Sequence, residues 1–197
     1  MRIEIMQKDI EKWLAKDGKK FLEKIGVQKG QVLLDFGCSV GHYTIPAAKV
    51  VGIKGKVYAV DKERGALNQL MQNAKSEGLE NIVTMTTSGA FKINMESNSA
   101  DAVLLYDILH YLCLEERREL YNEVYRILKT DSFLSICPKH YKSDEPLWEL
   151  SDIALESIIK EIEDAYFCFK SKSFKKLIHD NNYDKGYILN FTPLDKS

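Results

Sequence analysis

The chain has 197 residues, with 28 Lys and Arg against 29 Asp and Glu, so its formal net charge is −1. This balance gives no electrostatic footprint for nucleic acid or an anionic membrane, and neither is expected as a partner. No apolar run approaches the roughly 20 residues that a membrane-spanning helix needs, so no membrane insertion is expected. Met1–Met6 lack the apolar core of a signal peptide, and a cytoplasmic location is therefore expected.

The four cysteines are widely scattered, and no two of them form a C-x-x-C pair, so the spacing typical of zinc or redox sites is absent. Our interpretation is that these thiols are reduced and mostly buried, as free cysteine commonly is. An alternative, that several of them converge on a thiophilic substrate such as arsenite, rests on their number alone. The residues are Cys38, Cys113, Cys137 and Cys168.

Helical and strand patterns alternate along the chain. Residues 7–24 carry apolar side chains at a helical period that Asp17-Gly18 interrupts, which predicts two short helices or one broken helix. A helix or turn is predicted at residues 173–180, between the last two strands. The other predicted elements are strands at 32–36, 56–61, 81–87, 100–107, 133–138, 165–171 and 186–192, and helices at 42–51, 62–77, 115–129 and 146–163.

This alternation predicts a single, mostly parallel α/β sheet of seven strands. The last two strands are joined without a full crossover helix, so an antiparallel strand is expected at the edge of the sheet. No Gly/Pro/Ser-rich linker, repeat or low-complexity tract divides the sequence. We therefore expect one domain over residues 1–197, with a helical segment at 1–25, a ligand-binding core at 30–140, and a C-terminal helix and edge strands at 141–197.

The stretch 32–41 organises the rest of the chain, because a run of apolar residues ends in an acid and a glycine-containing turn. Glycine at a strand-to-helix turn lets the backbone take a positive φ or approach a ligand closely. In open α/β sheets, ligands bind at the carboxyl ends of the strands, where this turn is expected. Gly37-Cys38-Ser39-Val40-Gly41 provides neither the G-x-G-x-x-G of dinucleotide sites nor the Gly-Lys-Ser/Thr ending of a P-loop.

A second acid, Asp61, ends the second predicted strand 20 residues beyond Gly41. In nucleotide-binding α/β folds, an acid at this place accepts hydrogen bonds from ribose hydroxyls. An exposed aspartate with no ligand is the alternative, but its pairing with the first turn favours binding.

Asp35, Gly37 and Gly41 match the first motif of the class I S-adenosylmethionine (SAM) methyltransferases, acid-x-Gly-x-Gly-x-Gly, with Ser39 at the usual middle glycine. Further motifs follow in order over residues 30–140, and the chain resembles this family. The stretches Gly41–Ala48 and Gly55–Asp61 are similar to the ubiquinone/menaquinone-biosynthesis type. The resemblance implies a doubly wound, Rossmann-like fold, SAM as cofactor and methyl transfer by in-line displacement.

The resemblance also implies roles for individual residues. Asp35 would organise the turn near the methionine amino group, and Asp61 would bind the ribose hydroxyls. Tyr106, at the end of the fourth strand, would lie near the methionine moiety or the transferred methyl group. The full set implied for the cofactor is Asp35, Gly37, Cys38, Gly41, Tyr43, Asp61, Lys62, Gly89, Ala90 and Tyr106.

Methyl transfer needs a base only if the acceptor must lose a proton, so few catalytic residues are obligatory. His110 and Tyr106 are the candidates we select, and Tyr43, Asp107 and Tyr111 are expected near the cleft. The alternative for His110 is a packing or capping role in a segment that looks helical. His42 and His140 lack acids at metal-ligand spacing, and no metal site is expected.

The sequence departs from the family pattern at Ser39, Gly89 and Thr130-Asp131-Ser132. These departures leave open a degenerate methyltransferase fold used for binding or regulation. An NAD-dependent enzyme is disfavoured by the missing third glycine. A cap formed by residues 1–25 and 141–163 would suit a small-molecule or lipid-like acceptor. A homodimer through the sheet edge or the N-terminal helices is possible.

Overall fold

The computed structural model describes residues 2–87, 91–142 and 150–194. The chain forms two compact units: Met1–Ser88 with Lys175–Gly186, and Gly89–Phe174 with Tyr187–Ser197. Their strands belong to one seven-stranded sheet in the order β3-β2-β1-β4-β5-β7-β6. Pairing is parallel for β1–β2, β2–β3 and β4–β5 and antiparallel for β5–β7, so the predicted α/β sheet is confirmed.

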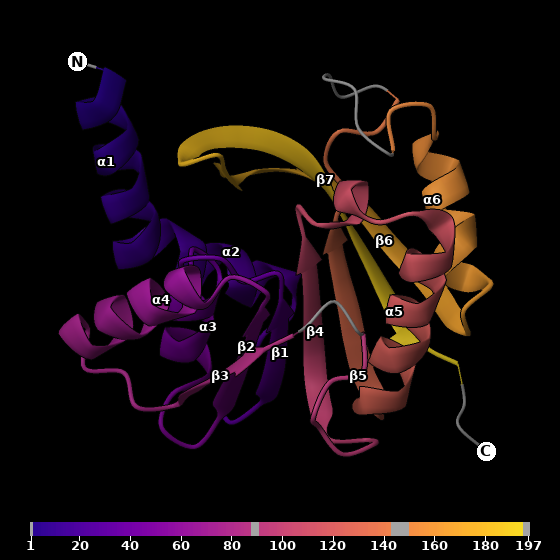
Figure 1. The fold of residues 1–197 in the computed structure, drawn as a ribbon, viewed down its shortest axis with the longest axis horizontal. Helices are drawn as coiled ribbons and strands as arrows, with labels where there is room; N and C mark the ends of the chain where they lie inside the picture. The colour runs from indigo at the N-terminus through magenta and orange to yellow at the C-terminus, as the bar shows by residue number, and fades with distance from the viewer. Residues whose placement is uncertain (1, 88–90, 143–149, 195–197) are drawn as a thin grey trace. The chain divides into compact units, whose positions relative to one another are not determined.

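The first unit holds the parallel strands β1, β2 and β3 with the helices beside them (Figure 1). In β1, Leu33 and Leu34 are fully buried, as expected for a strand covered on both faces. The elements are α1 (Arg2–Lys12), η1 (Trp13–Asp17), α2 (Gly18–Ile25), β1 (Val32–Phe36), α3 (Thr44–Val51), β2 (Lys56–Asp61), α4 (Arg64–Ser76) and β3 (Ile82–Thr86).

The N-terminal helical segment is continuous, and the predicted interruption is a π-helical turn at Trp13–Asp17. Gly18 continues the helix with φ −62° and ψ −42°. A Cβ on Gly18 would lie 2.7 Å from Pro46 Cγ and 2.9 Å from Trp13 Nε1. The glycine therefore permits close packing of α2 against α3 and does not end the helix.

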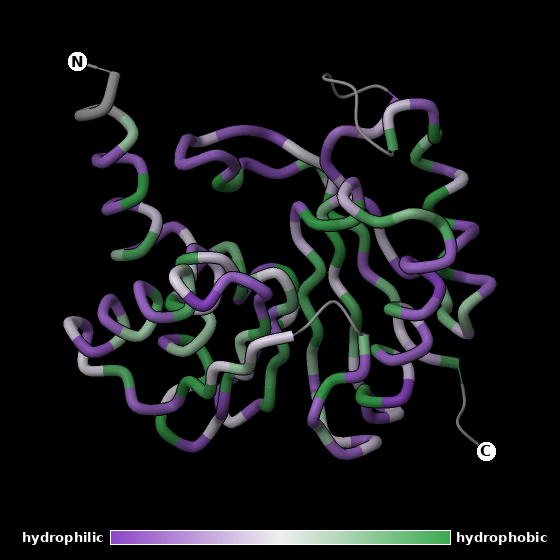
Figure 2. Tube along the Cα trace, viewed as in Figure 1, coloured by the Kyte–Doolittle hydropathy of each residue, from purple (hydrophilic) through white to green (hydrophobic). Residues whose placement is uncertain are grey.

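The second unit is built around the parallel pair β4 and β5, with α5 beside them (Figure 1). The hydrophobic colour runs through β4 in Figure 2, and Val103, Leu104 and Leu105 are fully buried. Its elements are β4 (Ala100–Tyr106), the short 3-10 helix η2 (Leu109–Tyr111), α5 (Leu114–Ile127), β5 (Leu128–Cys137), α6 (Leu155–Glu163), and most of β6 (Phe167–His179) and β7 (Asn182–Pro193).

Thr130-Asp131-Ser132, where the family pattern has proline and glycines, lies inside β5. The register of β5 against β4 shifts at this point, between Ala100 and Ala102. The Ser132 hydroxyl donates a hydrogen bond to the Lys129 carbonyl, and the Lys129 amine lies 2.6 Å from the Asp101 carboxylate. β5 starts directly after α5, and Thr130-Asp131-Ser132 is accommodated in a bulge near the start of this strand.

The helix predicted at 146–163 is wrong over residues 150–154. The described part of this segment begins with turns at 150–152, and α6 starts only at Leu155. Ala154, which the sequence pattern places in the helix interior, is its N-cap and has extended backbone with ψ 150°. Residues 143–149 lie outside the described residues.

The helix or turn predicted at 173–180 is wrong over residues 173–179, which belong to β6, and a turn is present only at Asp180 and Asn181. Asp180 and Asn181 form the two-residue connection, with φ of 46° and 64°. These angles fit a type I′ turn, which favours Asp and Asn because both tolerate the left-handed region.

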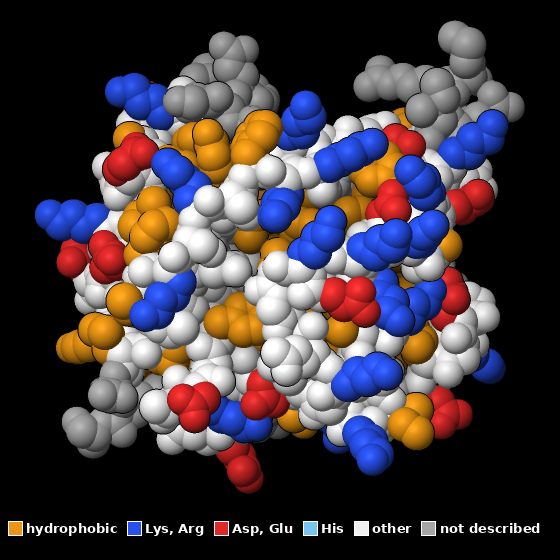
Figure 3. All heavy atoms as spheres, turned by 180° about the vertical axis from the view of Figure 1, so that it is seen from behind, with side chains coloured by type: hydrophobic (Ala, Val, Ile, Leu, Met, Phe, Trp, Pro, Cys, Tyr) orange, Lys and Arg blue, Asp and Glu red, His pale blue; other side chains and the backbone are white. Residues whose placement is uncertain are grey.

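Both signs of charge are interspersed on the face shown in Figure 3. Among the described residues, no helix has the length and apolar character needed to cross a membrane.

Candidate functional site

The turn after β1 is held by a set of short backbone hydrogen bonds. The amides of Gly37 and Cys38 both donate to the Val60 carbonyl, at 2.8 and 3.1 Å. The Gly41 amide closes the turn by donating to the Cys38 carbonyl at 3.0 Å. Ser39, at the place of the usual middle glycine, has φ 48°. It therefore adopts the left-handed conformation that the family pattern assigns to glycine.

Asp61 links the end of β2 to this turn. Its Oδ2 accepts a hydrogen bond from the Ser39 amide at 2.7 Å, and its Oδ1 accepts one from the Glu63 amide at 2.9 Å. A carboxylate has about four lone-pair directions, so the side chain retains acceptor capacity for hydroxyl groups. This geometry fits the predicted contact to a ribose.

Asp35 lies under the turn and is 2% exposed. The Thr44 hydroxyl, at the start of α3, donates a hydrogen bond to Asp35 Oδ2 at 2.5 Å. Burial raises the pKa of Asp35 to about 7, and the nearby Asp61 carboxylate adds to the rise while the Thr44 hydrogen bond opposes it. A positively charged group placed beside Asp35 would favour its ionised form.

Gly41 has a packing role in addition to its place in the motif. With φ 93°, it adopts backbone that other residues rarely take. A Cβ at this position would lie 2.2 Å from Cδ1 of Leu70, a fully buried residue of α4. Gly41 is therefore needed for the close packing of the turn against α4, in addition to its expected role of bringing the backbone near a ligand.

Three further residues predicted to bind the cofactor lie at or near this turn: Cys38, Tyr43 and Lys62. The Tyr43 hydroxyl donates to the Ile178 carbonyl at 2.7 Å, within the first unit. Cys38 is buried, and burial raises the pKa of its thiol, so this cysteine is not a reactive thiolate. Lys62 is exposed.

The N-terminal segment contacts this turn directly. The Trp13 indole donates to the His42 carbonyl at 2.7 Å, and its ring meets the Tyr43 ring edge-on at 5.5 Å. The cap predicted from residues 1–25 and 141–163 stays a prediction. In the second unit, α6 is bound to α5 by the ion pair of Arg117 and Glu161 at 2.7 Å.

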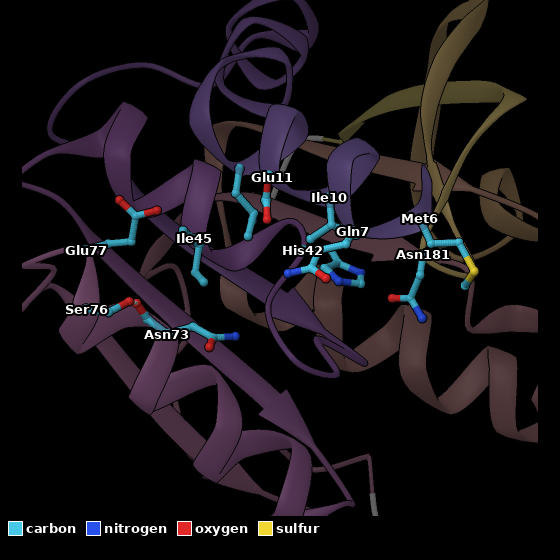
Figure 4. A pocket seen from close by; sticks show the side chains of 11 residues that line it. Met6, Gln7, Ile10, Glu11, His42, Ile45, Asn73, Ser76, Glu77 and Asn181 are labelled. Atoms are coloured by element: carbon cyan, nitrogen blue, oxygen red, sulfur yellow. Dashed lines mark hydrogen bonds between the residues drawn. The ribbon is translucent and has the colours of Figure 1, made fainter. Parts of the chain in front are cut away.

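The first unit also contains a cavity of about 480 Å³ between α1, α4 and the β6–β7 connection (Figure 4). Gln7 and Ile10 line it from α1, Asn73 from α4, and His42 and Asn181 from the two loops. Burial lowers the pKa of His42, which favours its neutral form. Neither predicted cofactor acid, Asp35 or Asp61, lines this cavity, so it is distinct from their site.

In the second unit, Tyr106 ends β4 and is 4% exposed. Its hydroxyl is hydrogen-bonded to the Ser135 hydroxyl of β5 at 2.8 Å. His110 lies in η2 and is 1% exposed, so it has no open approach from solvent. Gly89 and Ala90 lie outside the described residues.

Asp107 and His110, both expected near the cleft, form a cluster with His140, which the sequence pattern did not predict. Asp107 Oδ1 lies 3.7 Å from His110 Nδ1 and 3.9 Å from His140 Nε2. The two imidazole rings are 4.5 Å apart. The available signal was topological, because residues that follow neighbouring parallel strands meet at one edge of the sheet.

The predicted residues thus form two groups. Asp35, Gly37, Cys38, Gly41, Tyr43, Asp61 and Lys62 belong to the first unit, and Tyr106 and His110 belong to the second. Their roles toward a cofactor or substrate stay predictions.

Comparison with known proteins identifies the family to which this chain belongs. A family model described as a methyltransferase domain matches residues 33–131, which run from β1 into β5. The chain is 44% identical over 63 residues to a probable cobalt-precorrin-6B C(15)-methyltransferase (decarboxylating) of Saccharolobus solfataricus, covering 32% of each. It is 25% identical over 174 residues to a demethylmenaquinone methyltransferase of Lactobacillus johnsonii, covering 88% of this chain and 65% of that protein.

The chain thus spans less than two thirds of the length of these two curated relatives. Among solved structures, a SAM-dependent methyltransferase from Aquifex aeolicus shares the fold, with a TM-score of 0.75 and 22% identity over 98% of this chain and 99% of that one. The family match covers half of the sequence and includes both acids of the first unit. This chain belongs to the class I, SAM-dependent methyltransferase family.

Proposed function

We propose that this chain transfers a methyl group from SAM to a small-molecule acceptor by in-line displacement. The observation that carries the proposal is the Asp61 carboxylate, which joins the end of β2 to the Ser39 amide of the first motif. The two motif elements that would hold the cofactor are thus fixed relative to one another before a ligand binds.

The residues of the first unit fit SAM in charge and in hydrogen-bonding capacity. Asp61 would hold the ribose hydroxyls through the acceptor directions that Ser39 and Glu63 do not use. Asp35 would hold the ammonium group of the methionine moiety, directly or through the turn that it supports. When bound, SAM supplies a methyl group on a positively charged sulfur, which is already a strong electrophile.

The contribution of the protein is then mainly positional. Holding donor and acceptor in a reactive geometry is worth roughly 7–11 kcal/mol of the barrier. The hydrogen bonds of Asp61 and the packed glycine at Gly41 pre-organise the turn for this purpose. Preorganised sites do not spend binding energy on ordering themselves.

The acceptor class is proposed from the relatives. The demethylmenaquinone methyltransferase aligns with 88% of this chain, and the precorrin methyltransferase with 32%. We therefore place a lipid-like ring compound first among the candidate acceptors. A cytoplasmic location, a single domain and a homodimer stay predictions; light scattering during size-exclusion chromatography measures the oligomeric state.

The direct test is calorimetric titration of the full chain with SAM, with its demethylated product S-adenosylhomocysteine, and with NAD. We expect micromolar binding of the first two and none of NAD. Binding of NAD alone would favour the dinucleotide alternative. Binding of SAM without methyl transfer to any quinol, phenol or tetrapyrrole acceptor would favour a binding or regulatory protein.

A further inference from the structure

One face of the N-terminal helix lines the cavity of the first unit. Met6, Ile10 and Leu14 follow one another at every fourth residue and form an apolar row along this face. Gln7 and Glu11, also four residues apart, line the cavity beside that row. All eleven lining residues belong to the first unit. The cavity is therefore formed within one compact part of the chain.

The walls of the cavity are held by contacts between distant segments. The Lys49 amine donates a hydrogen bond to the Leu14 carbonyl at 2.9 Å and lies 3.0 Å from Glu77 Oε2, which ties η1 to the end of α4. The Tyr183 hydroxyl, from the start of β7, donates to Asp17 Oδ2 at 2.7 Å. The volume of about 480 Å³ falls in the range of small-molecule sites, which are largely pre-formed.

The His42 imidazole offers hydrogen bonds inside this cavity. Figure 4 shows the ring between Asn73 of α4 and Asn181 of the β6–β7 turn. Burial lowers the pKa of His42, so the neutral ring presents one N–H donor and one acceptor nitrogen. Among the described residues, none hydrogen-bonds to either ring nitrogen. Buried polar groups are ordinarily hydrogen-bonded, so this ring favours a ligand with a matching polar group.

The charge of the lining favours a cation. Glu11 and Glu77 contribute carboxylates, and the described lining residues include no lysine or arginine. Lys49, which does not line the cavity, pairs with Glu77. No described residue forms an ion pair with Glu11. A protonated amine would make a charge-assisted hydrogen bond to this carboxylate, whereas an anion would be repelled by it.

We propose that this cavity binds a small organic cation, an amine carried on an apolar body, at a site separate from the cofactor acids. The amine donates to Glu11, a hydroxyl or similar polar group of the ligand bonds to His42, and the apolar body lies against the apolar row. The inference goes beyond the proposed function and does not depend on it, because neither Asp35 nor Asp61 lines the cavity.

The test titrates the full, isotope-labelled chain with three probes that share an eight-carbon body and one terminal hydroxyl. The probes are 8-aminooctan-1-ol, octane-1,8-diol and 8-hydroxyoctanoate, whose other terminus at neutral pH is a cation, a neutral group and an anion. Nuclear magnetic resonance follows the His42 imidazole and the backbone signals of the lining residues, and it gives a dissociation constant for each probe.

Three variants locate the binding site. Glu11→Gln removes the charge and keeps the shape of the side chain. Gln7→Trp places a large ring in the cavity from an exposed position of α1. Glu23→Gln is the matched control, because Glu23 is an exposed acid of α2 that pairs with Lys19 and does not line the cavity.

We expect the amine to bind and to shift the His42 signals, and the diol to bind at least about fivefold more weakly, as the loss of a partly exposed ion pair implies. The carboxylate should not bind. Glu11→Gln should weaken amine binding to the level of the diol, Gln7→Trp should abolish binding of both, and Glu23→Gln should behave as the wild type. Equal binding of amine and carboxylate, an unchanged amine affinity in Glu11→Gln, or shifts confined to residues outside the cavity overturns the proposal.

A titration in the presence of S-adenosylhomocysteine separates this site from the cofactor site. The amine should still shift the His42 signals when S-adenosylhomocysteine is present in excess. Displacement of the amine by S-adenosylhomocysteine would place the amine in the cofactor site and overturn the proposal. A chain that binds the amine in the cavity but binds neither SAM nor S-adenosylhomocysteine would support this inference and contradict the proposed function alone.

Discussion

The Ser39 amide donates a hydrogen bond to Asp61 Oδ2 at 2.7 Å, although the two residues are 22 positions apart. The bond joins the turn after β1 to the end of β2. It explains how a serine can stand where the family pattern has glycine: the backbone keeps the left-handed conformation, with φ 48°, and its amide has a charged acceptor. Hydrogen bonds to charged groups contribute about 1.5–3 kcal/mol, which is enough to offset the cost of about 1–2 kcal/mol for the strained backbone.

Ser39→Gly should stabilise the fold. The substitution removes the left-handed strain of a residue with a Cβ and keeps the backbone hydrogen bond to Asp61. We expect a gain of about 0.5–1 kcal/mol in the free energy of unfolding, after the larger chain entropy of glycine is subtracted. Urea unfolding measures it. Ser171→Gly, in strand β6, is the control and should destabilise. A loss of stability in Ser39→Gly contradicts the interpretation.

Gly41→Ala should be strongly destabilising, because the new methyl group would lie 2.2 Å from Leu70 Cδ1. Overpacking of a core typically costs about 1–3 kcal/mol, in addition to the cost of the positive φ. Gly52→Ala is a matched control, since Gly52 has φ 66° but no heavy atom within 4 Å of the point where a Cβ would lie. The difference in unfolding free energy between the two variants isolates the contact. Equal losses in both would show that packing against Leu70 is unimportant.

Asp35 should make stability depend on pH. Its pKa is about 7 in the folded chain and near 3.8 when unfolded, so the folded state holds the proton longer. Between these values the unfolded state binds fewer protons, and stability therefore falls as pH rises from about 4 to 7. Asp35→Asn lacks this term. As pH rises from 4 to 8, the free energy of unfolding of Asp35→Asn should therefore increase relative to that of the wild type by on the order of a few kcal/mol.

Chemical denaturation of wild type and Asp35→Asn at several pH values checks this prediction. Thr44 still finds an acceptor in the asparagine carbonyl, so the hydrogen bond to the turn is kept. A constant difference in stability across the pH range would mean that Asp35 titrates normally.

Glu161→Ala should destabilise the second unit. Arg117 is 2% exposed and makes two hydrogen bonds to Glu161, at 2.8 and 2.7 Å, which join α5 to α6. Removing the acid leaves a buried charge and should cost about 3–5 kcal/mol. The exposed pair of Lys19 and Glu23 is the control, and Glu23→Ala should cost less than about 1 kcal/mol. Thermal unfolding compares the two, and similar losses would contradict the assignment.

The strands of the sheet were predictable because buried parallel strands are continuous apolar runs. Val103-Leu104-Leu105 in β4 is such a run, and all three residues are fully buried. The two edge strands were predicted, but the extension of β6 through residues 172–179 and of β7 through 182–185 was missed, because the lysines and serines before Leu177 gave no clear period. Asp180-Asn181 was the available signal, since this pair suits a type I′ turn.

The positions of Asp35 and Asp61 in the first unit could be predicted from the local sequence, whereas the meeting of His140 with Asp107 in the second unit could not. Asp35 and Asp61 each end a recognisable strand, so their places could be predicted from the residues around them. His140 meets Asp107 only because β4 and β5 pair in parallel in a particular register, with Tyr106 opposite Cys137. That register depends on the bulge in β5, which no short-range pattern indicates.

Asp61→Ala tests the central claim most directly. The substitution removes the acceptor of the Ser39 amide and the group that we expect to hold the ribose, and Asp131→Ala, an exposed acid of β5, makes the same charge change elsewhere. Calorimetric titration with SAM should show micromolar binding to the wild type and to Asp131→Ala. In Asp61→Ala, binding should weaken by about 100-fold or more, as the loss of charge-assisted hydrogen bonds implies. Equal affinity in all three proteins would contradict this account of the cofactor site.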